Sequence, residues 1–260
     1  DGVMDRRAFL LGASGTASAL AGCADIGALG DGRAGLRDLP ERPADLTPES
    51  VEAYVAAYEA ARAHNRHARA GAAEVSVDAV ATFDYAVGDE RFATAQHAGT
   101  ARYEDDGDRA VGELYGRPVP YLVAPDRTLR MPVERRRIGT GASGRSPDAA
   151  SPPPLGVRLC NATDEPREFA VTVVRREGDA GGESVLSTAV GLDPECAVEL
   201  LGIADAPGGY RVTASMEADG VTGQGRIDVG LPGVDRGPNA DVVVGDSGVS
   251  AWHLPPFEKV

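Results

Sequence analysis

Three of the four histidines have a spacing that could, in principle, hold a metal ion. His64 and His67 lie one turn apart on a predicted helix, and His97 lies in an extended segment that follows it. Imidazole is a common zinc ligand, but no carboxylate or cysteine stands at ligand spacing beside these residues, and the interleaved arginines would repel a cation. We therefore interpret the first two histidines as part of a solvated helix end, and we predict neither a metal nor a cofactor.

No stretch of the chain has the spacing of a familiar catalytic motif. His-Glu-x-x-His, Gly-x-Ser-x-Gly and Walker-type glycine loops are absent from the sequence. The acidic run at 105–108 lacks the rest of a calcium loop, so it is more simply the tip of a hairpin. The basic run at 135–137 is expected to pair with acidic neighbours. The sequence therefore predicts no catalytic residues, and the protein is not expected to be an enzyme.

Cys160 and Cys196 form an even pair in the C-terminal half. In an exported protein such a pair could form a disulfide. However, Cys160 alternates out of phase with Val157 and Leu159, whereas Cys196 is in phase with the apolar residues that follow it. The two thiols would then lie on opposite faces of their strands, so two free thiols are the alternative.

Asn161 begins an Asn-Ala-Thr sequence at the end of a predicted strand. This is an N-glycosylation sequon, and an exported protein could carry a glycan on it. Sequons of three residues also arise by chance, so the glycan remains one of two interpretations.

The strongest signal of the chain lies in residues 1–22. Two adjacent arginines precede a Phe-Leu pair and an apolar run of about fourteen residues, which is too short to cross a bilayer of roughly 30 Å. This stretch resembles a twin-arginine signal, the address of a route that exports folded proteins. The residues that carry the resemblance are Arg6, Arg7, Phe9 and Leu10. The alternative is a buried N-terminal helix with a chance arginine pair.

Cys23 follows the apolar run and completes a second motif. The segment before it, Leu20, Ala21 and Gly22, resembles a lipobox, in which the signal is cut before the cysteine and the thiol is lipidated. Small residues suit this chemistry because a peptidase must hold extended backbone. One acyl chain gives marginal binding at about 0.8 kcal/mol per methylene, so stable anchoring needs two chains or a second signal. The motif predicts a lipid anchor in the cell membrane, with the protein facing outside.

The charge balance is strongly acidic. The chain has 26 Lys and Arg against 40 Asp and Glu, for a net charge of −14, and Lys259 is its only lysine. In molar salt the Debye length falls to about 3 Å, which screens the self-repulsion. With the signal, this composition resembles that of haloarchaeal exported lipoproteins; a mildly acidic protein from a high-GC mesophile is the alternative. Acidity argues against nucleic acid as a partner.

The pattern along the chain predicts two modules. The sequence predicts a helix at 48–69. Thr47 can cap it, Pro48 suits its first turn, and the negative charge of Glu49 is favourable near the positive end of the helix dipole. Extended runs at 75–87, 92–103, 111–123 and 128–133 follow, and the prolines at 118 and 120 confine the third to an edge or a break. A helix on an antiparallel meander is an α+β unit, similar in layout to the cystatin-like and NTF2-like rolls.

After a Pro- and Ser-rich stretch the pattern changes to short alternating runs separated by turns. Six or seven strands at this spacing predict an all-β sandwich, which resembles immunoglobulin-like and CARDB-like modules. The expected division is signal 1–22, lipidated cysteine and flexible tether 23–46, α+β domain 47–138, linker 139–154, sandwich 155–253 and tail 254–260.

These observations predict a non-catalytic, lipid-anchored cell-surface protein that serves as an interaction or spacer module with an unknown extracellular protein partner. The alternative is that residues 47–138 form a roll that binds a small ligand or catalyses a reaction. That alternative requires a cavity between helix and sheet. Its expected lining residues are Tyr54, Tyr58, Phe83 and Tyr85.

Overall fold

The computed structural model describes residues 33–105, 108–139, 154–176, 182–218, 221–231, 238–245 and 248–257. The signal residues and Cys23 lie outside these ranges. Residues 33–260 form one compact unit. Within the described ranges, no helix combines the length and the apolar character needed to span a membrane.

The predicted helix is confirmed at both ends. Helix α1 spans Pro48–Arg69, and the Thr47 hydroxyl oxygen accepts a hydrogen bond from the Ser50 amide at 3.2 Å. Pro48 stands in the first turn, where its missing amide hydrogen costs nothing. Val51 and Val55 are fully buried on the face toward the sheet, so local capping and an apolar stripe define this element together.

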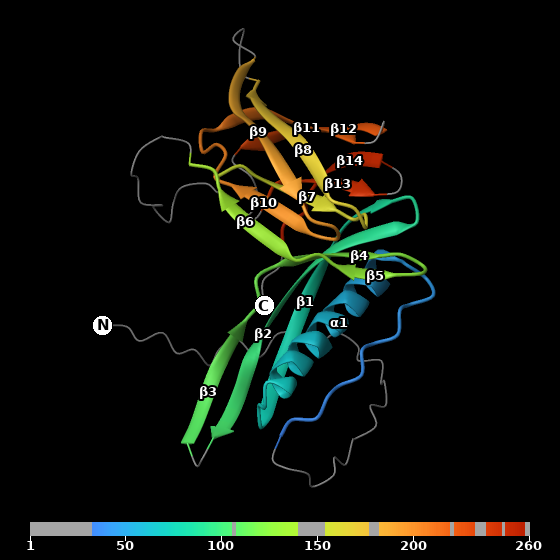
Figure 1. Cartoon of the computed structure of the whole chain (residues 1–260), viewed down its shortest axis with the longest axis vertical. Helices are drawn as coiled ribbons and strands as arrows, with labels where there is room; N and C mark the ends of the chain where they lie inside the picture. Colours follow the sequence, from blue (N-terminus) through green and yellow to red (C-terminus); the bar gives the residue numbers. More distant parts are fainter. Residues whose placement is uncertain are drawn as a thin grey trace, which may run out of the picture. The chain divides into compact units, whose positions relative to one another are not determined.

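An antiparallel sheet follows and packs on α1. Its strands are β1 (Glu74–Val87), β2 (Glu90–Asp105), β3 (Asp108–Tyr115), β4 (Val119–Val123) and β5 (Thr128–Arg130). The order is β1-β2-β4-β5, and β3 pairs with the other end of β2. Figure 1 shows α1 along one face of β1 and β2. The predicted third run is interrupted at 116–118, where the first proline stops it.

The remaining strands form two further sheets. They are β6 (Val133–Arg137), β7 (Gly156–Asn161), β8 (Arg167–Arg175), β9 (Glu183–Leu192), β10 (Ala197–Leu201), β11 (Gly208–Ala218), β12 (Val221–Leu231), β13 (Ala240–Gly245) and β14 (Gly248–His253). One sheet has the order β14-β13-β7-β10-β6 and the other β12-β11-β8-β9. Both contribute to one apolar core, with residues such as Leu159, Phe169 and Val212 fully buried. A helix with a meander, followed by a β-sandwich, is therefore the architecture.

The expected domain boundary at 138/139 does not separate the modules. Strand β6, whose residues were expected in the first domain, pairs in parallel with β10 of the sandwich, with Val133 opposite Ala197. Ile138 continues this contact by donating its amide hydrogen to the Leu201 carbonyl at 2.9 Å. The basic run in β6 therefore belongs to the edge of the second module. Of the expected linker at 139–154, residues 140–153 lie outside the described residues.

The described part of the expected tether is not free but lies on the first module. The Asn65 side chain of α1 bonds both the amide and the carbonyl of Arg37, each at 2.7 Å. Ala34 donates to the Ala72 carbonyl at 2.8 Å, and Arg42 donates to the carbonyls of Pro125 and Asp126. These hydrogen bonds, from backbone and side-chain groups, hold the segment from residue 34 to residue 42 against the module.

A β-bulge in β1 divides the residues that were expected to line one cavity. The register with β2 shifts between Phe83 and Tyr85, which makes Asp84 the extra residue. A regular strand would put Phe83 and Tyr85 on the same face. Here Phe83 packs toward α1, while Tyr85 stacks on Phe92 at 4.7 Å and on Trp252 of β14 at 5.2 Å between ring centroids.

Candidate functional site

The interface between helix and sheet is filled by its own side chains. Tyr58 lies 5.8 Å from Tyr54 and 6.0 Å from Tyr121 between ring centroids, and Phe83 packs against the same cluster. The expected lining residues are thus core residues, because they contact one another. The bulge removes Tyr85 from this face altogether.

The three histidines have three separate partners. His64 is buried and does not belong to a solvated helix end as expected: its Nε2 lies 2.8 Å from the Gly35 carbonyl. His67 Nδ1 lies 2.7 Å from the Tyr103 hydroxyl. His97 faces the interior of the first module. Among the described residues no three histidine, cysteine or carboxylate side chains are grouped as metal ligands.

Glu59 is the centre of a buried network that sequence reasoning missed. It is 1% exposed on α1 and accepts hydrogen bonds from His97 Nδ1 on β2 (2.7 Å), Arg130 Nε on β5 (2.9 Å) and the Tyr121 hydroxyl on β4. Burial alone would raise the pKa of Glu59. The bonds from His97, Arg130 and Tyr121 outweigh it and lower this pKa from 4.5 to about 2. The carboxylate therefore stays ionised and joins four elements.

Gly116 supports this network from the sheet, and a substitution there should disturb it. A Cβ at Gly116 would lie 2.4 Å from His97 Cε1, and the bond to Glu59 keeps the ring in place. We expect Gly116→Ala to lower the free energy of unfolding by about 1–3 kcal/mol, as overpacking does, measured by denaturant titration. Gly112→Ala on β3 is the matched control, since nothing lies within 4 Å of its added methyl group; equal losses for both would contradict the assignment.

A second network centres on Arg158 of β7. Its guanidinium donates to Asp84 Oδ2 at 2.9 Å, Asp241 Oδ2 at 2.7 Å and the Thr94 hydroxyl at 2.8 Å. The Tyr85 hydroxyl also donates to Asp241, at 2.6 Å. The arginine and Asp241 belong to the sandwich, whereas the other three belong to β1 and β2. The bulge therefore has a structural role, because it directs Asp84 and Tyr85 toward the second module.

The electrostatics of this second network favour structure over catalysis. Burial raises the pKa of the Tyr85 hydroxyl and of the Cys160 thiol, and the charge of Asp241 raises both further. Burial also raises the pKa of Asp84, an effect that Arg158 opposes. Phenol and thiol thus remain neutral, so neither is an activated nucleophile.

A small cavity lies beside Arg158, between the two modules. It has a volume of about 170 Å³, below the roughly 300–1,000 Å³ of typical ligand sites. Glu199 lines it; burial raises the pKa of this carboxyl, although Arg135 Nε binds it at 2.7 Å. Arg158 Nε is buried without a hydrogen-bond partner. The cavity suits water or a very small polar molecule.

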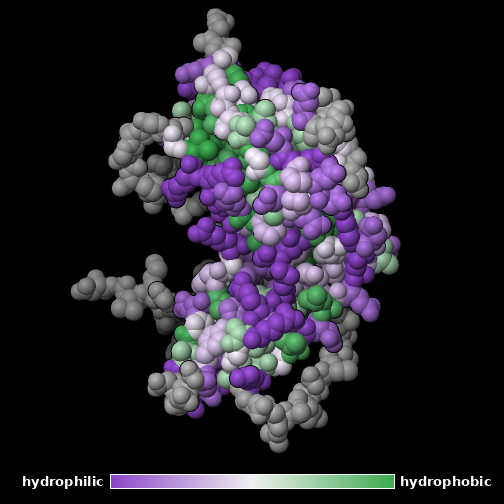
Figure 2. Space-filling model, in the orientation of Figure 1, coloured by the Kyte–Doolittle hydropathy of each residue, from purple (hydrophilic) through white to green (hydrophobic). Residues whose placement is uncertain are grey.

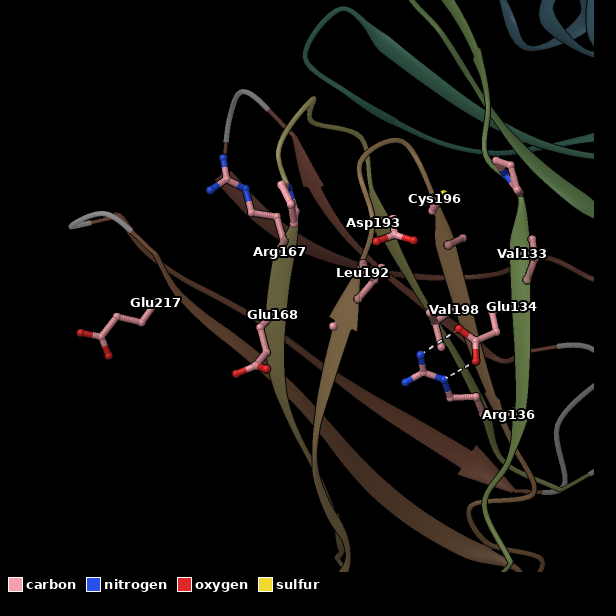
Figure 3. A pocket seen from close by; sticks show the side chains of 14 residues that line it. Val133, Glu134, Arg136, Arg167, Glu168, Leu192, Asp193, Cys196, Val198 and Glu217 are labelled. Atoms are coloured by element: carbon pink, nitrogen blue, oxygen red, sulfur yellow. Dashed lines mark hydrogen bonds and ion pairs between the residues drawn. The ribbon is translucent and has the colours of Figure 1, made fainter.

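A larger groove runs along the open edge of the sandwich (Figure 3). It encloses about 790 Å³ between β6 and β10 on one side and β8 and β9 on the other. Its apolar lining includes Val133, Leu192 and Val198, and Glu134 pairs with Arg136 at 2.8 Å across its rim. A further four side chains line it and carry charge: Arg167, Glu168, Asp193 and Glu217. The groove is several times larger than the cavity beside Arg158.

Both cysteines of the sandwich are free thiols, so of the two alternatives the structure has the free thiols and the possible disulfide is not formed. Strand pairing places Cys160 opposite Ala197, one position from Cys196, and adjacent positions point to opposite faces. Cys160 is buried and donates to Asp241 Oδ1 at 3.4 Å. Cys196 lines the groove instead, and burial together with Asp193 raises its pKa, which makes it a poor nucleophile.

The Asn161 side chain is not available for a glycan. It is fully buried, and its Nδ2 donates to the carbonyls of Glu165 at 2.7 Å and Asp193 at 3.0 Å. Its Oδ1 accepts from the amide and the hydroxyl of Thr163. The Asn-x-Thr sequence thus forms an Asx-type turn after β7, a local structure that these residues favour.

The remaining predicted site residues, those of the export signal and Cys23, lie outside the described residues. For the whole chain, comparisons with known protein families, with curated proteins and with solved structures return no match.

Proposed function

We propose that this protein is a lipid-anchored cell-surface module that binds another extracellular protein and catalyses no reaction. The observation that carries the proposal is that the buried acid, base and phenol groups of the protein are bonded to one another. Glu59, His97 and Tyr121 are bonded to one another through one carboxylate, and Asp84 and Asp241 are neutralised by one guanidinium. Groups bonded to one another in this way stabilise the fold and are not free to transfer protons to a substrate.

The sequence supports the location. Arg6, Arg7 and the segment that ends in Cys23 have the layout of a twin-arginine lipoprotein signal. Export in the folded state suits a chain whose two modules share a buried charge network, because that network forms only when both have folded. On the face in Figure 2 hydrophilic residues predominate, as expected for a protein that works in salt. From this signal and the acidic, lysine-poor composition we propose that the protein is a haloarchaeal surface lipoprotein. We propose that its sandwich is of the immunoglobulin-like class.

The groove along β6 and β9 is the contact surface that we assign to the partner. Its charged lining has four carboxylates, Glu134, Glu168, Asp193 and Glu217, and two arginines. This excess favours a polypeptide that presents basic side chains, over nucleic acid or anionic lipid.

Lipidation at Cys23 is tested by the intact mass of the protein extracted with detergent from native membranes in high salt. We expect a chain that begins at Cys23 and carries lipid. Cys23→Ser should abolish both the lipid mass and the membrane association, because the thiol is the acceptor. Cys196→Ser is the matched control, since that thiol lies in the sandwich. A soluble, unprocessed chain of full length would contradict the proposal.

A further inference from the structure

Strand β3 presents an unused hydrogen-bonding edge. Among the described residues it pairs only with β2, and Figure 1 shows it as the outer strand at that end of the sheet. Gly116 donates its amide hydrogen to the His97 carbonyl at 2.9 Å, in register with β2. Since hydrogen-bonded pairs recur at every second residue, positions 110, 112 and 114 also bond to β2. The backbone groups of Arg109, Val111 and Glu113 therefore point outward from the sheet.

The exposed face of β3 contains apolar residues that no described residue covers. Val111 is 68% and Tyr115 is 73% exposed, and Leu114, on the opposite face, is buried beneath α1. Natural edge strands usually discourage pairing with lysine, proline or a bulge. Strand β3 has none of these over its eight residues. Its exposed charged residues, Arg109 and Glu113, have opposite signs, so they oppose only those registers that bring like charges together.

We propose that two copies of this chain pair through β3 in antiparallel orientation, with Val111 of one copy opposite Val111 of the other. In this register Arg109 of each copy lies opposite Glu113 of its partner, which gives two ion pairs on the exposed face. Directly opposed residues share a face and lie about 5 Å apart, close enough for these pairs. Ala110 then lies opposite Gly112 on the other face, where both are small.

The hydrogen-bond pattern permits this register. The outward backbone groups belong to Arg109, Val111 and Glu113. In the two-fold symmetric pair, Val111 lies opposite its own copy and Arg109 lies opposite Glu113, so outward groups meet only outward groups. The edge of β1 is a poorer alternative, since its exposed charged residues, Glu74 and Asp78, are both acidic and two copies would bring like charges together. The Phe83 amide on β1 is already bonded to the Glu52 carboxylate at 2.8 Å.

The pairing is tested by sedimentation velocity on the full chain carrying Cys23→Ser, across a range of concentrations in molar salt that screens the net charge. We expect a reversible monomer–dimer equilibrium. Val111→Pro removes an outward amide without removing a bond to β2, so it should weaken dimerisation at least about tenfold while leaving the fold intact. Val111→Thr keeps the amide and should leave the dimer in place.

Charge exchange and cross-linking test the register itself. Glu113→Arg places arginines opposite each other and should weaken the dimer about 5- to 30-fold, and adding Arg109→Glu should restore it.

Val111→Cys should give a covalent dimer on oxidation, because hydrogen-bonded partners have Cα atoms about 5.5 Å apart. Glu113→Cys should not, since its copies lie four residues apart. A chain that is monomeric at every concentration, or a Val111→Pro variant that dimerises like the parent, would overturn the proposal.

Discussion

Replacing Arg158 with methionine should lower the free energy of unfolding by about 3–5 kcal/mol at neutral pH. Methionine is similar in length, but it leaves Asp84 and Asp241 as buried carboxylates without a countercharge. The loss should be smaller near pH 4. Burial already raises the pKa of Asp84, and without the guanidinium this carboxyl would take up a proton more readily, which relieves the unpaired charge. Chemical denaturation at constant salt and several pH values measures both effects.

Arg136→Met is the matched control for that experiment. Arg136 also binds a carboxylate, that of Glu134, through two hydrogen bonds of 2.8 Å. The pair is exposed, with 36% of the arginine and 61% of the glutamate side chain accessible. Solvent screens such a pair, so its removal should cost far less than the removal of Arg158. Similar losses for the two variants would mean that the network around Arg158 does not hold the two modules together.

Local signals explain why the helix and most of the strands were predictable. Thr47 and Pro48 act within one turn of α1, and alternation within β1 or β8 depends only on neighbouring residues. Residues 133–137 were placed in the first domain because strand pairing is not local and nothing near them in the sequence indicates β10 as their neighbour. Arg135 and Arg136 pair with acidic residues, as expected from the sequence, but the partner of Arg135 is the buried Glu199 of β10.

The buried charges were missed although the sequence contained a signal for each. Glu59 lies four residues after Val55, on the apolar stripe of the helix, and Arg158 stands between the apolar residues Val157 and Leu159 of a strand. A charge at an apolar position indicates a buried partner. The partners of Glu59 come from β2, β4 and β5, and nothing in a single sequence identifies them. The bulge at Asp84 is similarly hidden, because one extra residue reverses the face of everything after it.

Replacing Glu59 with glutamine should lower the free energy of unfolding by about 3 kcal/mol at neutral pH. The pKa of Glu59 is lowered from 4.5 to about 2 in the folded protein, and each unit corresponds to about 1.4 kcal/mol. Glutamine keeps the shape of the side chain but has no charge for Arg130 and only one acceptor oxygen. Glu52→Gln on the same helix is the matched control, since the amide oxygen of glutamine can still accept the Phe83 amide hydrogen.

The pH dependence of this difference identifies the ionised carboxylate as its cause. Because the folded pKa is the lower one, the contribution of Glu59 is present above pH 4.5 and is lost as the pH falls toward 2. Asp84 and Glu199, whose pKa values are raised, contribute with the opposite sign, but they are common to both proteins and cancel in the difference. The stabilities of parent and Glu59→Gln should therefore converge between pH 4.5 and 2. Parallel profiles across that interval would show that Glu59 is not held as a buried anion, and the network on α1 would then have to be explained by neutral hydrogen bonds.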